Sequence, residues 1–148
     1  MTGAKRSTPL PLEQTLELSA ATSELRRVSA WLYDQLGDGI PKEALLALDL
    51  GLQECLANTI IHGSPTAAIR VSLRRFEDRV EIEVEDDGMP FDPLGAVLPP
   101  LPTQLEDMEL GGNGIRLMRR FLDEMSYRYS SGRNHLVMVR RTGARTEE

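Results

Sequence analysis

Hydrophobic spacing divides the first part of the chain into a strand and a helix. Residues 12–18 alternate apolar and polar side chains toward their end, which predicts an edge strand. Thr22 or Ser23 then offers an N-cap for a helix that runs to about Leu36. The apolar positions of this helix recur on one stripe, at Leu25, Val28, Leu32 and Leu36. Glycines at positions 37 and 39 predict its end.

A second helix is predicted from Pro41 to about His62, where Gly63 and Pro65 end the pattern. Residues 67–76 and 79–86 then alternate with period two and are joined by two acidic residues, which predicts a β-hairpin. Residues 92–110 contain four prolines and show no periodicity, which is typical of a lid or a disordered loop.

The last part of the chain predicts a third helix and a second hairpin. Residues 111–114 open the helix, and its inward positions are expected at Ile115, Met118, Phe121, Leu122 and Met125. Two closing strands follow at about residues 126–129 and 135–141, with a turn at residues 131–134. The order of elements predicts an α+β fold, a two-layer sandwich with helices on one face of a mainly antiparallel sheet.

Composition and charge restrict the classes of function. The chain has 148 residues and a net charge of −6, and only two of its 17 basic residues are lysines. Without a clustered positive surface, direct nucleic-acid binding is not expected. The single cysteine excludes an internal disulfide framework. The apolar runs are shorter than a bilayer span and the N-terminus does not resemble a signal peptide, so we expect no membrane segment and a cytoplasmic protein.

The second helix carries polar residues that its packing does not require. Its apolar stripe consists of Leu45, Leu48, Leu52, Cys55, Leu56 and Thr59. Gly51, Glu54, Asn58 and His62 gather on a different face, three or four residues apart. A carboxylate, a carboxamide and an imidazole on one face indicate a binding site, although a solvated helix face would show the same residues.

Two glycine-containing segments follow that helix. Asp86-Asp-Gly88 comes directly after a predicted strand, and an ionised aspartate can accept a hydrogen bond from an exocyclic amine such as that of adenine. The same three residues also make ordinary turns. Three glycines in residues 111–114 precede a helix whose N-terminus could bind phosphates, although a lid hinge would look similar. This loop is neither a Walker loop nor a dinucleotide-binding fingerprint.

Taken in order, these motifs resemble the Bergerat-fold ATPases, which include gyrase, histidine kinases and mismatch-repair ATPases. The resemblance covers about residues 12–141, so a single histidine-kinase-like ATPase domain is expected over residues 1–148, with residues 1–11 and 143–148 loose and residues 92–110 as the ATP lid. Within the superfamily the chain looks most like the anti-sigma-factor serine kinases, the RsbW/SpoIIAB family. The supporting segments are residues 53–63, 86–93, 111–118 and 122–125.

The resemblance implies roles for the matching residues. Asn58 would bind Mg²⁺, and Glu54 would orient or deprotonate the attacking serine hydroxyl. Asp86 would bind the adenine amine and Gly88 would shape the turn below the base. The phosphates of ATP would lie against Gly112, Asn113 and Gly114.

Two departures from the family pattern concern the same pocket. Pro90 stands where the family has a second glycine, which predicts a stiffer loop under the nucleotide. The predicted lid has no lysine, so a cation at the phosphates would be Arg116, an inference from its position in the first turn of the third helix.

The implied function is that of an ATP- and Mg²⁺-dependent serine/threonine-protein kinase in a partner-switching pathway. It would phosphorylate a STAS-type anti-anti-sigma factor, bind a sigma factor or a similar regulatory protein, and form a homodimer. Two alternatives remain open. One is an ATP-binding module that sequesters a partner with little or no transfer. The other is a catalytic domain descended from a histidine kinase, against which the absence of an acceptor domain counts.

Overall fold

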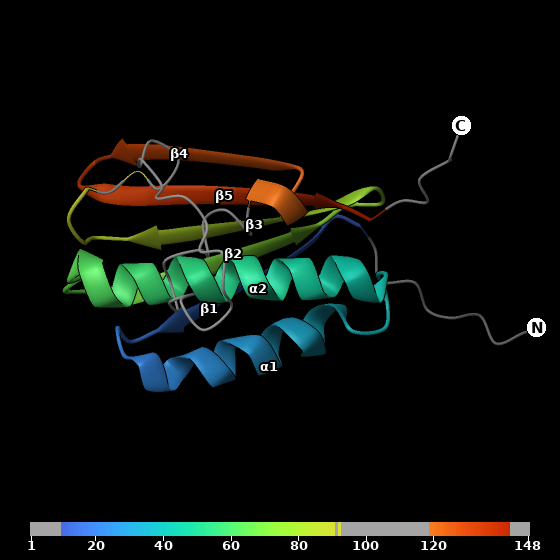
Figure 1. Cartoon of the computed structure of the whole chain (residues 1–148), viewed down its shortest axis with the longest axis horizontal. Coiled ribbons are helices and arrows are strands. Elements are labelled where there is room, and N and C mark those ends of the chain that lie inside the picture. The colour runs from blue at the N-terminus through green and yellow to red at the C-terminus, as the bar shows by residue number, and fades with distance from the viewer. Residues whose placement is uncertain (1–9, 91, 93–118, 143–148) are drawn as a thin grey trace, which may run out of the picture.

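The computed structural model describes residues 10–90, 92 and 119–142 (Figure 1). The N-terminal part contains strand β1 (Leu12–Leu18), the short helix η1 (Thr22–Glu24) and helix α1 (Leu25–Leu36). Helix α2 (Lys42–Asn58) continues into one π-helical turn, η2 (Thr59–Gly63). The remaining strands are β2 (Ile69–Arg75), β3 (Arg79–Asp86), β4 (Glu124–Ser130) and β5 (Arg133–Arg141).

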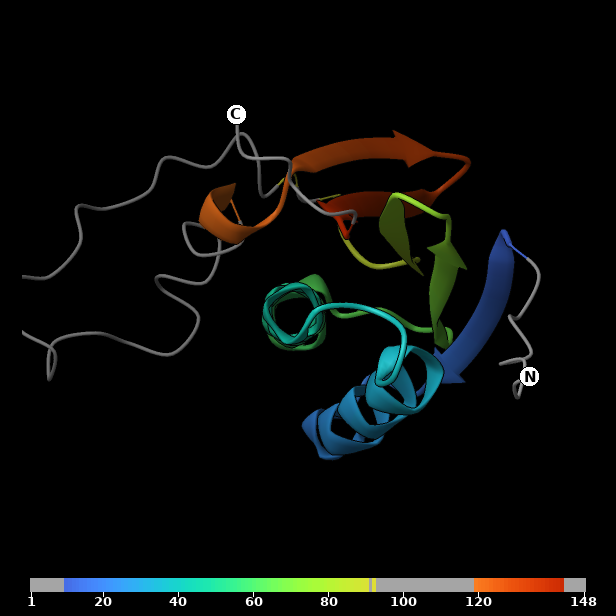
Figure 2. The ribbon, with the colours of Figure 1, turned by 90° about the vertical axis from the view of Figure 1, so that its right-hand side faces the viewer.

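The five strands form one sheet in the order β1-β2-β3-β5-β4, and each neighbouring pair is antiparallel. Helices α1 and α2 cover one face of this sheet (Figure 2). Alternation in β3 directs Val80, Ile82 and Val84 toward the helices, because all three are buried while the residues between them are glutamates. The predicted α+β sandwich is therefore confirmed, and β1 is an edge strand as expected.

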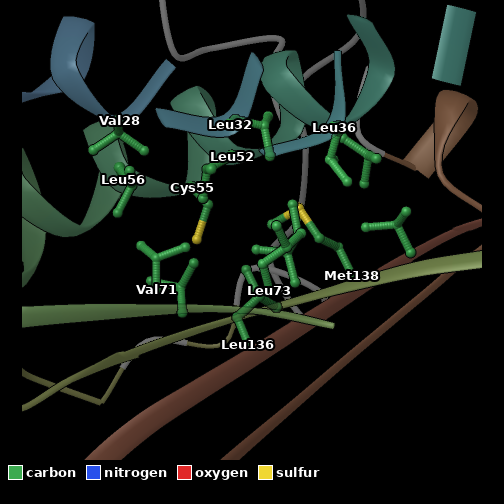
Figure 3. Packing of buried hydrophobic residues seen from close by; sticks show 14 of the residues in the cluster. Val28, Leu32, Leu36, Leu52, Cys55, Leu56, Val71, Leu73, Leu136 and Met138 are labelled. Atoms are coloured by element: carbon green, nitrogen blue, oxygen red, sulfur yellow. The ribbon is translucent and has the colours of Figure 1, made fainter. Parts of the chain in front are cut away.

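The hydrophobic core lies between the two helices and the sheet (Figure 3). The predicted stripe of α1 is buried at Val28, Leu32 and Leu36, and Leu25 packs against the core from its margin. The stripe of α2 is buried from Leu45 to Leu56, as the helical spacing predicts. Burial of each such leucine contributes about 1.5–3 kcal/mol, so this layer holds the two helices on the sheet.

Helix residues 42–63 form the one described segment that is long and apolar enough, by length and composition, to cross a membrane. Its apolar character has another explanation in this fold. Eight residues of α2 are buried, and five of them belong to the core cluster that α2 shares with α1 and the sheet. The hydropathy of this segment is therefore that of a helix at the centre of the core.

The predicted third helix lies largely outside the described residues, as do the lid and the glycine loop. Within the described part, residues 119–121 are helical and Leu122 is buried as expected. Two expectations were wrong: Phe121 is 40% exposed, and Met125 lies in β4. The helix ends at Phe121, whose carbonyl accepts a hydrogen bond from Arg140. Met125 then reaches the core margin from a strand, paired with Met138.

Asp49 on α2 provides a test of pH-dependent stability. Burial raises the pKa of its carboxyl, although Ser29 on α1 donates a hydrogen bond to it. An acid whose pKa is raised on folding loses stabilising effect as the pH rises from its unfolded value of 3.8 through the folded value. Asp49→Asn should therefore stabilise the protein at pH 7, by up to about 1 kcal/mol given the partial exposure of the group, and change little at pH 3.

Thermal unfolding of the Asp49→Asn variant at the two pH values measures this difference. Asp34→Asn, at an exposed position of α1, is the matched control. Equal stabilisation at pH 3 and pH 7 would show that burial of the charge is not the cause.

Candidate functional site

A cavity lies where the C-terminal end of α2 and the turn after β3 meet strands β4 and β5. Its walls come from segments that are distant in the sequence, and they include the predicted residues Asn58 and Asp86. The lining residues are Cys55, Asn58, Thr59, Gly63, Val84, Asp86, Met89, Tyr127, Asn134 and Leu136. The structure thus brings the end of the second helix and the acidic-glycine segment into one site.

Asp86 is the buried acidic group of this cavity. It is 4% exposed, at the last position of β3. Its Oδ1 accepts hydrogen bonds from the Gly88 amide at 2.8 Å and from Asn134 Nδ2 at 3.1 Å. Among the described residues both donors reach the same oxygen, which leaves Oδ2 as the oxygen that can accept from a ligand. A buried carboxylate with such a free acceptor position is suited to bind an amine.

Gly88 lies in the turn after β3, where the backbone approaches the Gly63 carbonyl at the end of η2. The Met89 amide donates to the Gly63 carbonyl at 2.8 Å. A Cβ on Gly88 would overlap that carbonyl oxygen and stand 2.9 Å from Asp86 Oδ1. The position therefore requires glycine because of this close approach.

Replacement of Gly88 by alanine should lower the free energy of unfolding by about 1–3 kcal/mol, because backbone atoms must move to admit the methyl group. Gly63→Ala is the matched control, since its added Cβ would make only ordinary contacts at 3.8 and 3.9 Å. Thermal melts of both variants without nucleotide measure the difference. Equal melting temperatures for the two variants would contradict the steric argument.

The second aspartate of the pair has a different environment. Asp87 lies outside the cavity and accepts hydrogen bonds from the Thr66 amide at 2.8 Å, the Thr66 hydroxyl at 2.5 Å and the Ala67 amide at 3.1 Å. The Thr66 hydroxyl and these amides lower the pKa of Asp87 to about 2. Asp87 therefore anchors the segment between η2 and β2, whereas Asp86 faces the site.

Glu54 lies one turn before Asn58 on α2, next to the cavity but not in its wall. The side chain is half-buried, and its Oε1 has no hydrogen-bond partner within the described residues. Burial raises the pKa of this carboxyl. A carboxylate with a raised pKa is a stronger base, so this environment suits proton transfer. His62, from the same predicted face, is exposed and outside the wall.

The predicted phosphate-binding residues cannot be placed. Gly112, Asn113, Gly114 and Arg116 lie outside the described residues, so their roles stay predictions.

Cys55, Tyr127 and Asn134 are among the lining residues that the sequence did not assign to the site. Burial, together with the nearby charge of Asp86, raises the pKa of the Cys55 thiol to about 12. The thiol is therefore neutral and forms part of the apolar wall. Asn134 faces inward at the start of β5, opposite Asp86. Alternation from Leu136 and Met138 would have predicted its inward direction, although not its partner.

Another group of metal-ligand types lies on the opposite face of the sheet. One ligand atom from each of Glu83, Glu85 and His135 falls within 4.8 Å of the others. His135 Nδ1 is 2.8 Å from Glu83, and Arg133 is 2.5 Å from Glu85. Arg128 also forms an ion pair with Glu83, at 3.7 Å. Because guanidinium groups already compensate these carboxylates, we assign the group to the charge network of the outer face.

The residues that line the cavity offer the chemistry that the base end of a nucleotide requires. Apolar atoms of Val84 and Leu136 can pack against a planar base, and Asp86 offers an acceptor at the same wall. Asn58 also lines this cavity, and its side chain carries an amide oxygen of the kind that binds divalent cations.

Comparison with known proteins agrees with this arrangement. The family model described as a histidine kinase-like ATPase domain matches residues 16–140. The chain belongs to this family. The serine/threonine-protein kinase BtrW of Bordetella bronchiseptica is 36% identical over 84% of this chain and 91% of its own length. An anti-sigma F factor of a Thermoanaerobacter species is 28% identical over 84% of this chain and 87% of its own length.

A solved structure supports the fold. The crystal structure of the RsbU and RsbW domains of a Mycobacterium tuberculosis protein matches with a TM-score of 0.66 and 18% identity. The match covers 91% of this chain and 33% of that chain, so this chain spans about a third of its length. This structure supports the fold, and the family match together with the two relatives confirms the predicted RsbW/SpoIIAB-like family. The predicted enzyme class, a serine/threonine-protein kinase, is confirmed at the level of this family.

Proposed function

We propose that the chain binds ATP in this cavity and transfers the γ-phosphoryl group to a serine of a STAS-type anti-anti-sigma factor. The observation that carries the proposal is the position of Asp86, buried in a wall shared with Asn58 and held by Gly88 and Asn134. Membership of the histidine kinase-like ATPase family supports a nucleotide as the ligand of this wall.

Different residues of the cavity are proposed to bind the base and the metal ion. Asp86 accepts a hydrogen bond from the 6-amino group of adenine, and the apolar wall packs against the ring. Asn58 would hold Mg²⁺ through its amide oxygen, and the bound ion would supply positive charge at the phosphates. The glycines of residues 111–114 and Arg116 are proposed to contact the phosphates from the segment outside the described residues.

Glu54 is the proposed base of the transfer step. It accepts the proton of the substrate hydroxyl while the serine oxygen forms a bond to the γ-phosphorus. The bond between that phosphorus and the bridging oxygen breaks, and ADP leaves. The unpartnered Oε1 of Glu54 and its raised pKa support this role.

The partners follow from the family. Its relatives include anti-sigma factors, which supports interactions with regulatory proteins. We propose that this chain works in the cytoplasm as a homodimer, and that it alternates between a STAS-type protein and a sigma factor or similar target.

A second candidate is an ATP-binding module that sequesters its partner without phosphorylating it. The position of Glu54 outside the cavity wall favours this alternative. A catalytic base at Glu54 would have to meet the substrate serine outside the cavity that the described residues form.

Incubation with γ-labelled ATP, Mg²⁺ and the STAS-type protein encoded nearest to this chain separates the two candidates. Transfer of label to a serine of the STAS protein is expected. ATP binding without labelled serine would reject the kinase and retain the binding module, and absence of ATP binding would reject both.

A further inference from the structure

Tyr127 and Asn134 form a hydrogen-bonded chain behind Asp86. The Tyr127 hydroxyl on β4 donates to Asn134 Oδ1 on β5. Asn134 Nδ2 in turn lies 3.1 Å from Asp86 Oδ1 and 3.0 Å from the Met89 carbonyl oxygen. It also contacts the Gly88 carbonyl oxygen at 3.3 Å. This series of hydrogen bonds connects the edge strand β4 to the turn after β3 that carries Asp86.

These contacts allow only one orientation of the Asn134 amide. Its Nδ2 faces a carboxylate and two carbonyls, all acceptors, and a flipped amide would direct Oδ1 at the same three atoms. The hydroxyl of Tyr127 satisfies Oδ1 in the observed orientation. Asn134 is only 7% exposed, so the hydroxyl of Tyr127 bonds this amide in a setting largely closed to water.

The orientation of the amide determines what the cavity offers to a base. Asn134 donates to Oδ1 of Asp86, so the bond to this amide does not use the second carboxylate oxygen. Asn134 also ties the Gly88 and Met89 carbonyls to β5, while the Met89 amide bonds the Gly63 carbonyl. The turn that carries Asp86 is therefore held from both sides.

We propose that Tyr127 and Asn134 are positioning residues for recognition of the 6-amino group of adenine, acting through Asp86. This inference rests on the proposed function, since it assumes that Asp86 binds that amine. It predicts an energetic coupling between the Tyr127 hydroxyl and one group of the ligand, which a residue that only stabilises the fold would not have.

The test compares ATP with purine riboside triphosphate, which lacks the 6-amino group. Dissociation constants for both nucleotides are measured by calorimetry for the wild type, Tyr127→Phe and Tyr129→Phe. Tyr129 is on the same strand, is 47% exposed and does not line the cavity, so its variant is the matched control. Wild type should bind ATP more tightly than the analogue.

Tyr127→Phe should weaken ATP binding about 3- to 10-fold and leave binding of the analogue nearly unchanged. Tyr129→Phe should preserve both affinities. Asn134→Ala should reduce the preference for ATP further, which provides a second reading if the first variant is poorly folded. Equal losses for both nucleotides, or no loss, would overturn the positioning role.

The wild-type measurement separates this inference from the proposed function. If wild type binds ATP and the analogue equally, Asp86 does not bind the amine, so both its role in the proposed function and the positioning role fail. If wild type prefers ATP and the Tyr127→Phe and Asn134→Ala variants keep that preference in full, only the positioning role fails.

Discussion

Replacement of Glu54 by glutamine is expected to slow phosphoryl transfer about 10²- to 10⁴-fold while ATP affinity stays within about twofold. Glutamine preserves the size of the side chain but cannot accept the serine proton. Because Glu54 lies outside the cavity wall, its loss should not disturb base binding. Single-turnover transfer of label to the STAS-type substrate measures the rate, and nucleotide titration measures the affinity.

Asp49→Asn is the matched control for this variant. Asp49 is on the same helix and also has a carboxylate oxygen that is buried without a hydrogen-bond partner in the described structure. Burial raises the pKa of both carboxyls, but Asp49 contacts α1 and does not line the cavity. Transfer should therefore survive in Asp49→Asn. If Glu54→Gln transfers phosphate at the wild-type rate, Glu54 is not the base.

Asp86→Asn is expected to weaken ATP binding about 10- to 100-fold, because a hydrogen bond to a charged acceptor contributes about 1.5–3 kcal/mol. The variant also introduces an amide next to Asn134, whose Nδ2 needs an acceptor at that position. Displacement of a fluorescent ATP analogue measures the loss. The measurement should be made well below the melting temperature of the variant.

Asp87→Asn separates the two adjacent aspartates. Asp87 anchors Thr66 and Ala67 outside the cavity, so this variant should lower thermal stability and change ATP affinity by less than about threefold. The opposite pattern, with strong loss of binding only in Asp87→Asn, would reverse the assignment of the two residues.

The sequence predicted those parts of the site that local patterns determine. Helical spacing separated the buried stripe of α2 from the face that carries Glu54 and Asn58, because periodicity records which side of a helix is covered. Alternation along β3 placed Asp86 at the end of a buried strand. Both features can be predicted from residues that are close together in the sequence.

The supporting contacts of the site depend on strand pairing and were missed. Asn134 lies 48 positions after Asp86, and the two meet only because β5 pairs with β3 in a particular register. Tyr127 reaches Asn134 through the next pairing, between β4 and β5. A one-residue change of register would direct these side chains to the other face, so no local pattern could have identified their partners.

The end of the third predicted helix shows the limit of periodicity in another way. Met125 continued the helical spacing of Phe121 and Leu122, yet it lies in β4 opposite Met138. Backbone pairing with β5 determines its conformation and overrides the local pattern.

The hydrogen bond between the Met89 amide and the Gly63 carbonyl has a consequence for how quickly and how tightly a nucleotide can bind. It joins the turn that carries Asp86 to the helical segment that begins after Asn58. The spacing between the group proposed for the base and the group proposed for the metal is therefore set before any ligand arrives. Association at this wall does not have to order these two segments, which reduces the entropic penalty of complex formation.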